Sequence, residues 1–220
     1  MSDGTLYIGN RRYSSWSMRG WLAVRLAGLD VDEQLIPFTR PGPTPAIAAL
    51  SPGGLVPYLE HQGAQVWESL AICDYCAEFN PALWPSDRTA RAWARSIAAE
   101  MHAGFRELRM AMWMNLGRDF TGLGRTQGAL ADVVRLEALW NRTRSRFGAG
   151  GPYLFGETFT AADIMYAPVV TRLLAWKPPT GPATDDYCLA VRSHPLVSAW
   201  YDAALAELDS WLIADYETPP

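Results

Sequence analysis

The sequence predicts two domains, an α/β domain followed by an all-helical one. Up to about residue 80 the spacing of apolar residues switches between the period of strands and the period of helices, and from about residue 86 it keeps the helical period. Between the two patterns lies "NPALWPSDR", in which Pro81 and Pro85 interrupt helix. We therefore expect the first domain over 1–82, a linker over 83–88 and the second domain over 89–220.

The first domain should open with a βαβ unit. "TLYIG" (5–9) and "EQLIPF" (33–38) have strand character, and a helix is expected between them over 16–29, where Met18 and Leu22 share a face. Because a single helix joins the two strands, they should pair in parallel through a right-handed crossover.

The rest of the first domain is expected to form a β-hairpin flanked by two helices. "RPGPTP" is rich in proline and glycine and predicts a loop, and "AIAAL" predicts a short helix. "VPYLE" and "AQVW" are short strands separated by "HQG", which indicates an antiparallel hairpin. A helix over "SLAICDYCAEF" completes the domain.

The second domain predicts long helices. Segments 87–114 and 126–147 are rich in Ala, Leu, Arg and Glu and should form the two arms of a helical hairpin. Later helices are expected over 160–176 and 194–212. The proline and glycine of "KPPTGPATDD" (177–186) predict a surface loop between them.

The composition indicates a globular protein without a nucleic-acid or membrane partner. The chain has 220 residues, of which 49% are hydrophobic, and a formal net charge of −4, so no basic surface is expected to attract a polyanion. No stretch approaches the roughly 20 apolar residues of a membrane span, and the first residues lack the layout of a signal peptide, so we expect a cytoplasmic location. Cys73, Cys76 and Cys188 are an odd number of cysteines, which favours reduced thiols over a disulfide framework.

Four segments carry a resemblance to a known family. In chain order they are "SSWSMR" (14–19), "SPGGLVPYL" (51–59), "ESLAICDY" (68–75) and "FTAADI" (159–164). They resemble "SSCSxR", "NPxGxVPxL", "ESxAIxxY" and "xTxAD" of the cytosolic glutathione transferases, and the first is similar to the zeta class. The resemblance, bacterial and zeta-like in appearance, implies a thioredoxin-like domain on a helical bundle, a homodimer, and glutathione as co-substrate.

A peptide site is expected where the second and third of these segments meet. Pro57 at a strand start removes a ladder donor, so the backbone of Val56 is left to pair with an extended peptide. Glu68 and Ser69 stand where a strand meets a helix, whose N-terminus attracts a carboxylate. Ser69 and the helix end would hold the acid of the γ-glutamyl group of glutathione, and Glu68 its ammonium. The alternative for Ser69 is a plain N-cap.

The serines before the first helix are candidates for activating the thiol. In the implied fold this helix begins at the sulfur of the ligand, where a hydroxyl can donate to a thiolate and lower the thiol pKa. Ser14 matches the zeta-class serine and is our first candidate, Ser17 is the second, and Ser15 is assigned to glutathione binding. The alternative is that the three serines only cap the helix. Trp16 replaces the cysteine of the zeta pattern, a departure that argues against maleylacetoacetate isomerisation.

The glycine end of the tripeptide has a less definite site. Many relatives place a lysine or glutamine where this chain has Leu55, which cannot pair with a carboxylate. Arg40 or His61 would then take that contact.

A pocket for a small apolar electrophile is expected from the helical domain. Met110 and Trp113 lie near the end of the first long helix, and Trp16 and Tyr166 complete the expected lining. Core packing of these side chains is the alternative. His102 and Arg109, with Glu100 and Arg106, would reach the cleft between the domains or coat the surface.

Three further patterns indicate no chemistry. "CDYC" has the spacing of a redox motif, but Cys73 lies a full turn inside its helix, so packing is expected. His61, His102 and His194 match no metal-binding spacing, and no metal is expected. "TAAD" (160–163) predicts a capping box.

The sequence therefore predicts a detoxifying glutathione transferase, an enzyme whose glutathione thiolate attacks a small apolar electrophile. Two alternatives remain. One is a glutathione-dependent disulfide or peroxide reductase or an isomerase, and the other is a glutathione-binding interaction protein without turnover.

Overall fold

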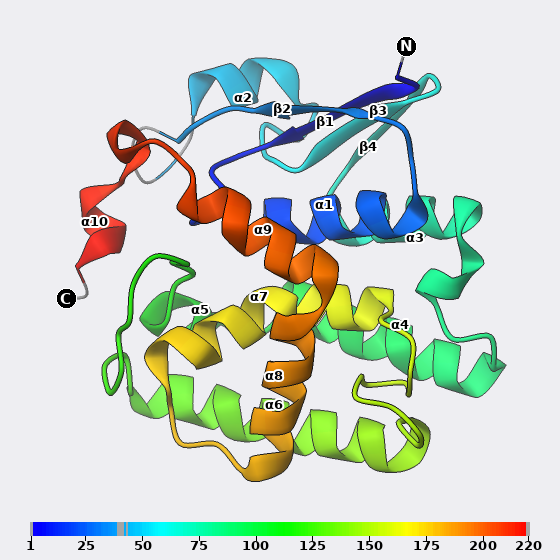
Figure 1. Cartoon of the computed structure of the whole chain (residues 1–220), viewed down its shortest axis with the longest axis vertical. Coiled ribbons are helices and arrows are strands. Elements are labelled where there is room, and N and C mark those ends of the chain that lie inside the picture. The colour runs from blue at the N-terminus through cyan, green and yellow to red at the C-terminus, as the bar shows by residue number, and fades with distance from the viewer. Residues whose placement is uncertain (1, 39–41, 43, 219–220) are drawn as a thin grey trace.

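The fold was analysed in a computed structural model, which describes residues 2–38, 42 and 44–218. A four-stranded sheet forms one end of the molecule, and a group of helices forms the other (Figure 1). The predicted fold class, an α/β domain followed by a helical one, is confirmed.

The sheet has the strand order β2-β1-β3-β4. β1 (Gly4–Ile8) pairs in parallel with β2 (Asp32–Leu35), and β3 (Tyr58–His61) pairs antiparallel with both β1 and β4 (Ala64–Trp67). The predicted parallel pair and hairpin are therefore confirmed. β2 is shorter than the expected 33–38 because Ile36 makes one more bond, to Ile8, and Pro37 then has no N–H to donate.

Three helices cover the sheet. α1 (Ser15–Ala27) and α3 (Ser69–Phe79) lie on the face toward the helical domain, and the short α2 (Pro45–Leu50) lies on the other face (Figure 1). At Gly20 a Cβ atom would come within 2.7 Å of Pro57, so glycine is what allows α1 to pack closely against the start of β3.

The first predicted arm of the helical domain is broken, which corrects the expectation of one helix over 87–114. A 3-10 turn (Pro81–Leu83) leads to α4 (Arg88–Ala103), and a separate α5 follows (Arg106–Ala111). Gly104 ends α4 in an extended conformation, and Phe105 adopts a left-handed one with its ring buried. The chain therefore turns at 104–105, and the residues after Ala111 form a loop beside α1 rather than a helix.

The second arm and its neighbours form as single helices. α6 (Gln127–Phe147) agrees with the prediction, and α7 (Ala161–Trp176) is buried on all sides over 161–173. The region predicted as a loop over 177–186 ends early, because α8 (Pro182–Ser193) begins within it. Proline is accepted at a first helical position, and α8 buries Tyr187 and Val191.

The last predicted helix is also shorter than expected. α9 (Pro195–Leu205) stops before Glu207, whose carboxylate accepts hydrogen bonds from the backbone N–H groups of Arg11 and Arg12. A 3-10 turn (Asp209–Trp211) and the short α10 (Ala214–Glu217) then bring the chain back beside the N-terminal domain (Figure 1).

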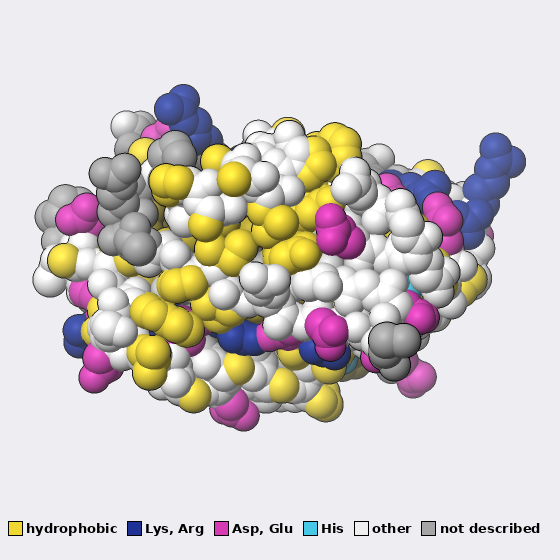
Figure 2. All heavy atoms as spheres, turned by 90° about the horizontal axis from the view of Figure 1, so that it is seen from above, with side chains coloured by type: hydrophobic (Ala, Val, Ile, Leu, Met, Phe, Trp, Pro, Cys, Tyr) yellow, Lys and Arg dark blue, Asp and Glu magenta, His cyan; other side chains and the backbone are white. Residues whose placement is uncertain are grey.

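The two domains share one buried apolar cluster that extends from Leu6 in β1 to Trp200 in α9. On the face that carries the sheet and α2, hydrophobic side chains gather near the centre and basic ones lie at separate places (Figure 2). Within the described residues, no helix has both the length and the apolarity needed to cross a membrane.

Candidate active site

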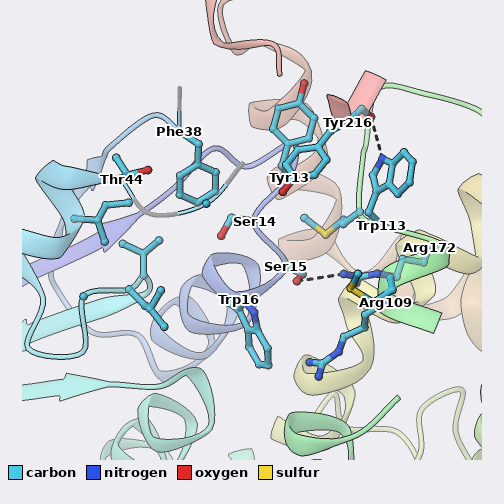
Figure 3. Close-up of a pocket in the computed structure, with 17 residues that line it drawn as sticks. Tyr13, Ser14, Ser15, Trp16, Phe38, Thr44, Arg109, Trp113, Arg172 and Tyr216 are labelled. Atoms are coloured by element: carbon cyan, nitrogen blue, oxygen red, sulfur yellow. Dashed lines mark hydrogen bonds between the residues drawn. The ribbon is translucent and has the colours of Figure 1, made fainter. Parts of the chain in front are cut away.

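Two adjoining cavities lie where the domains meet. The larger has a volume of about 660 Å³ and the smaller of about 380 Å³, and both are lined by Trp16, Leu55 and Val56. The larger cavity brings together the start of α1, the segment after β2, the end of α5, α7 and α10 (Figure 3). Its lining includes Tyr13, Ser14, Ser15, Phe38, Thr44, Arg109, Met110, Trp113, Met114, Arg172 and Tyr216.

The smaller cavity contains the start of α3. Ser69 is the first residue of this helix and is 1% exposed, and its Oγ has no hydrogen-bond partner among the described residues. Glu68 precedes it with a left-handed φ of 68°, a conformation uncommon outside glycine, and its side chain is about half exposed. A buried hydroxyl without a partner and a nearby carboxylate are therefore available to a ligand in this cavity.

His102 of α4 faces Glu68 from the helical domain. Its Nε2 lies 3.4 Å from the Glu68 carboxylate, and its ring lies edge-on to Trp16. Burial lowers the pKa of His102 below its usual 6.5 despite the opposing charge of Glu68. The imidazole is therefore neutral at neutral pH and leaves the negative charge of Glu68 uncompensated.

Val56 and Pro57 connect the two cavities. Both line the smaller cavity, Val56 also lines the larger, and the peptide bond between them is cis. No described residue makes a hydrogen bond to the backbone N–H or C=O of Val56. This edge is therefore available for pairing with an extended ligand.

Ser14 is the N-cap of α1 and lines the larger cavity. Its Oγ accepts a bond from the Ser17 N–H at 3.2 Å and lies 2.7 Å from the Ser17 Oγ. Ser17 is fully buried behind it, lines neither cavity, and accepts a bond from the Gly9 N–H. The two serines thus form a chain of hydroxyls in which only Ser14 faces the cavity.

Ser15 faces three arginines. Its Oγ accepts a bond of 3.3 Å from Arg172 of α7, which lines the cavity together with Arg109 of α5 (Figure 3). Arg19 of α1 lies behind them, and its guanidinium is 4.5 Å from the centre of the Trp16 ring. Burial and the neighbouring cations lower the pKa of both Arg19 and Arg172 to about 9. These arginines therefore remain cationic at neutral pH.

The C-terminal segment closes the far side of the larger cavity. The indole N–H of Trp113 donates to the backbone oxygen of Tyr216 (Figure 3). Tyr13 donates from its hydroxyl to Glu217. Arg118 also donates to Glu217. Because Tyr216 itself lines the cavity, α10 determines how far the cavity extends in this direction.

The structure separates two expected site residues from the cavities. Tyr166 was expected in the electrophile pocket, but it is fully buried, donates to the Ile97 carbonyl and packs against Trp140. His61 bonds to Tyr75 through Nδ1 and lines neither cavity. Both therefore serve packing here, and Arg40 lies outside the described residues.

Three residues expected in the electrophile pocket lie at a cavity. Trp16, Met110 and Trp113 line the larger cavity. Cys73 and Cys76 are buried and unpaired thiols, and burial raises the pKa of both, as packing inside α3 requires. Among the described residues, no group of three or more possible ligands could hold a metal ion.

The sequence analysis missed Arg172. Its signal was present, because "VVTRLLAW" places one charged residue among apolar ones in the part of α7 that follows the capping Asp163, with Thr171 as the one other polar side chain. A cation in such a helix must be buried or must face a cavity.

Two profiles of protein families match the chain, one in each domain. The profile described as "Glutathione S-transferase, N-terminal domain" matches residues 13–78, and that described as "Glutathione S-transferase, C-terminal domain" matches residues 91–203. The chain belongs to the glutathione S-transferase family. Both profiles fall within the predicted domains, on either side of the predicted linker.

Among the relatives of this glutathione S-transferase are proteins named for an isomerase. A "Probable maleylacetoacetate isomerase" of Caenorhabditis elegans is 27% identical over 168 residues, which are 75% of this chain and 76% of that protein. The "Maleylacetoacetate isomerase" of Pseudomonas aeruginosa is 36% identical over 121 residues, which are 52% of this chain and 56% of that protein. The resemblance to the zeta class, inferred from "SSWSMR", is thereby supported.

Solved structures of glutathione transferases share the fold. A homolog from Burkholderia, solved with bound glutathione, superposes with a TM-score of 0.69 at 24% identity and covers 93% of this chain and 99% of that one. A theta-class enzyme from Xanthomonas axonopodis pv. citri, also with glutathione bound, gives a TM-score of 0.67 at 23% identity, covering 94% and 99%. The predicted glutathione transferase fold is confirmed.

Proposed function

We propose that the chain is a glutathione transferase that holds glutathione across both cavities and activates its thiol beside Ser14. The observation that carries the proposal is the unpartnered, buried hydroxyl of Ser69 next to the uncompensated carboxylate of Glu68. A ligand whose end carries both a carboxylate and an ammonium satisfies both groups, and the γ-glutamyl end of glutathione is such a group. The N-terminus of α3 adds a favourable field for the carboxylate.

The middle of the tripeptide would pair with Val56. The free backbone N–H and C=O of this residue match the main chain of an extended cysteinyl residue. Its thiol would then extend toward the larger cavity, which Val56 and Ser14 both line.

The hydroxyl chain gives Ser14 the means to stabilise a thiolate. In the structure the Ser14 hydroxyl donates to the Ser17 Oγ, which also accepts from the Gly9 N–H. Because hydroxyl hydrogens rotate and Ser17 carries a proton of its own, Ser17 can donate to Ser14 instead when a thiolate is bound. Ser14 then has its proton free to donate to the sulfur. A hydrogen bond to the charged form lowers the thiol pKa from about 8.5, and the N-terminal field of α1 acts in the same direction. The thiolate attacks the electrophile in the larger cavity.

Glutathione-dependent isomerisation is the second candidate, favoured by the names of the curated relatives. The same thiolate would add to a double bond and leave again, so glutathione would not be consumed. Trp16 in place of the zeta-class cysteine is a difference at the site of this chemistry. The homodimer that the resemblance implies and the cytoplasmic location expected from the sequence belong to the transferase proposal.

Three substrates distinguish the alternatives. Turnover of a chlorinated nitroaromatic supports conjugation, turnover of hydroxyethyl disulfide supports reduction, and conversion of maleylacetoacetate supports isomerisation. Conjugation should be the fastest relative to its uncatalysed rate. If glutathione binds but none of the three reacts, the chain is a glutathione-binding protein without turnover and the proposal fails.

A further inference from the structure

Three arginines lie around Trp16 and Ser15 at the junction of the two domains. Arg19 comes from α1, Arg109 from α5 and Arg172 from α7. The guanidinium carbons of Arg19 and Arg109 lie 4.5 Å and 5.2 Å from the centre of the Trp16 ring, and Arg172 reaches Ser15 beside it (Figure 3).

Arg19 and Arg172 are buried and Arg109 is half-buried, and none of the three forms an ion pair with a described residue, although the charge of Asp132 acts on Arg109 from a greater distance. Arg19 is 0% exposed and Arg172 is 5% exposed, and none of the ion pairs between described residues involves Arg19, Arg109 or Arg172. Their hydrogen bonds go to neutral acceptors, namely Met165 O for Arg19, and Pro168 O and the Ser15 hydroxyl for Arg172.

Several N–H groups of the cluster have no acceptor among the residues that the structure describes. They are Nη1 and Nη2 of Arg19, Nε of Arg172 and Nη1 of Arg109. Burying the like charges of Arg19 and Arg172 with unused donors destabilises the protein, because each of the two cations has lost its water and repels the other. An anion that accepts these bonds removes both penalties, and charge-assisted bonds from arginine are among the strongest in proteins.

The cavity determines which of the arginines an incoming anion meets. Arg109 and Arg172 line the larger cavity together with Ser14 and Ser15, whereas Arg19 lies behind them. The carboxylate of the γ-glutamyl end has its own partner at Ser69, in the smaller cavity. The planar fork of a guanidinium fits an anion with two oxygens better than a single sulfur atom. The arginines therefore face the second substrate.

We propose that the electrophile carries a carboxylate, which Arg172 and Arg109 bind in the larger cavity with Arg19 as supporting charge. This inference rests on the proposed transferase function and refines it. The apolar electrophile expected from the sequence would pack against Met110 and Trp113, but it would leave the arginines without an anionic partner. Arg172 and Arg109 are thus the residues that determine specificity.

Two acceptors that differ only in charge test this. The glutathione thiolate displaces chloride from 4-chloro-3-nitrobenzoate and from 4-chloro-3-nitrobenzamide, forming the aryl thioether and releasing chloride in both cases. With each rate divided by its uncatalysed rate, kcat/KM should favour the benzoate by about tenfold or more, as a charge-assisted bond implies. Arg172→Met should bring the ratio near one, and Arg109→Met should lower it.

A matched control removes an arginine elsewhere. Arg95 is exposed on α4 with its guanidinium over Trp84, so Arg95→Met should leave the ratio unchanged. Equal corrected rates on both acceptors in the wild type would overturn the proposal. So would a ratio that stays the same in Arg172→Met while the thiol pKa of bound glutathione, followed by thiolate absorbance, rises, because the arginines would then serve the thiolate.

Binding without glutathione separates this inference from the proposed function. Calorimetric titration should show 3-nitrobenzoate binding at least about tenfold more tightly than 3-nitrobenzamide, with the difference lost in Arg172→Met. If this holds while no acceptor is conjugated, the transferase proposal fails and the carboxylate site stands. If conjugation proceeds but the two compounds bind equally, the carboxylate site fails alone.

Discussion

Ser14 and Ser17 show how two neighbouring hydroxyls receive different tasks from their burial. Both were candidates for activating the thiol, and their hydroxyls are hydrogen-bonded to each other. Ser14 lines the larger cavity, whereas Ser17 is fully buried and accepts the Gly9 N–H that follows β1. Removing the Ser14 hydroxyl should therefore lower turnover, and removing the Ser17 hydroxyl should mainly lower the free energy of unfolding.

Substitution of each serine by alanine tests this division. Ser14→Ala should lower turnover by about tenfold to a hundredfold, the value of one hydrogen bond to a charged group, and should raise the thiol pKa of bound glutathione with little change in its Kd. Ser17→Ala should lower the free energy of unfolding by about 1–2 kcal/mol, because the buried Gly9 N–H loses its acceptor. Turnover, thiolate absorbance and urea unfolding measure these effects. A Ser14→Ala enzyme with wild-type turnover would remove Ser14 from the mechanism.

His102 gives the binding of glutathione a predicted pH dependence. Because burial lowers its pKa below 6.5, His102 is neutral at neutral pH and becomes a cation only as the pH falls through that lowered value. The cation pairs with Glu68 and competes with the ammonium of the ligand. With S-methylglutathione, whose sulfur does not titrate, affinity should thus be constant above pH 6.5 and decline below it, because the carboxyl and amino groups of the ligand titrate outside this window.

Two histidine variants isolate the effect. His102→Gln should remove the decline in affinity at low pH in a calorimetric titration. His194→Gln should retain it, because His194 also has a pKa lowered by burial but stacks on Phe159 away from both cavities. A His102→Gln profile equal to that of the wild type would show that another group causes the decline.

Among the elements, α7 is the one on which both the fold and the site depend. It is buried on all sides, packs against α1, α4 and α8, and carries Arg172. Its N-terminus has the capping box predicted from "TAAD", since Asp163 accepts from both the N–H and the hydroxyl of Thr160. The same carboxylate also accepts from the Leu154 N–H and the Tyr187 hydroxyl, so it joins α7 to α8 and to the preceding loop.

Asp163→Ala should therefore be much more destabilising than loss of an ordinary cap. Four buried donors lose their acceptor, and the free energy of unfolding should fall by about 3–5 kcal/mol. Thr126→Ala, which removes the hydroxyl cap of α6, is the matched control and should cost about 1 kcal/mol. Urea unfolding monitored by circular dichroism compares them. Equal losses in the two variants would show that the contacts beyond the cap contribute nothing.

At the scale of the whole molecule, the sequence predicted most of the features that depend on neighbouring residues alone. Apolar period and turn residues predicted the order of strands and helices in the first domain, and "TAAD" predicted the capping box at the start of α7. The predictions were wrong where contacts with distant segments determine where a helix breaks or ends. The break at Gly104 and Phe105 depends on burial of the Phe105 ring, and the end of α9 depends on Glu207 reaching the backbone at Arg11 and Arg12.

The candidate site was predictable to the same extent. Ser14, Val56, Glu68 and Ser69 stand at element boundaries, where sequence patterns are informative, and the structure brings them to two adjoining cavities. Arg172 and Tyr166 lie on the same helix, and only the packing of both domains determines that the first faces a cavity and the second the core. Periodicity alone could not assign them, because α7 is buried on all sides over 161–173 and has no exposed face to set the pattern.

The central claim is that Ser69 and Glu68 bind the γ-glutamyl end of glutathione, and calorimetric titration with glutathione tests it most directly. The wild type should bind at millimolar concentration or below, and Ser69→Ala and Glu68→Gln should each bind at least about tenfold more weakly, the value of a bond to a charged group. Ser96→Ala, which removes an exposed hydroxyl bonded within α4, should bind like the wild type. No heat from the wild type at millimolar glutathione, or equal affinity in all four proteins, would contradict the account.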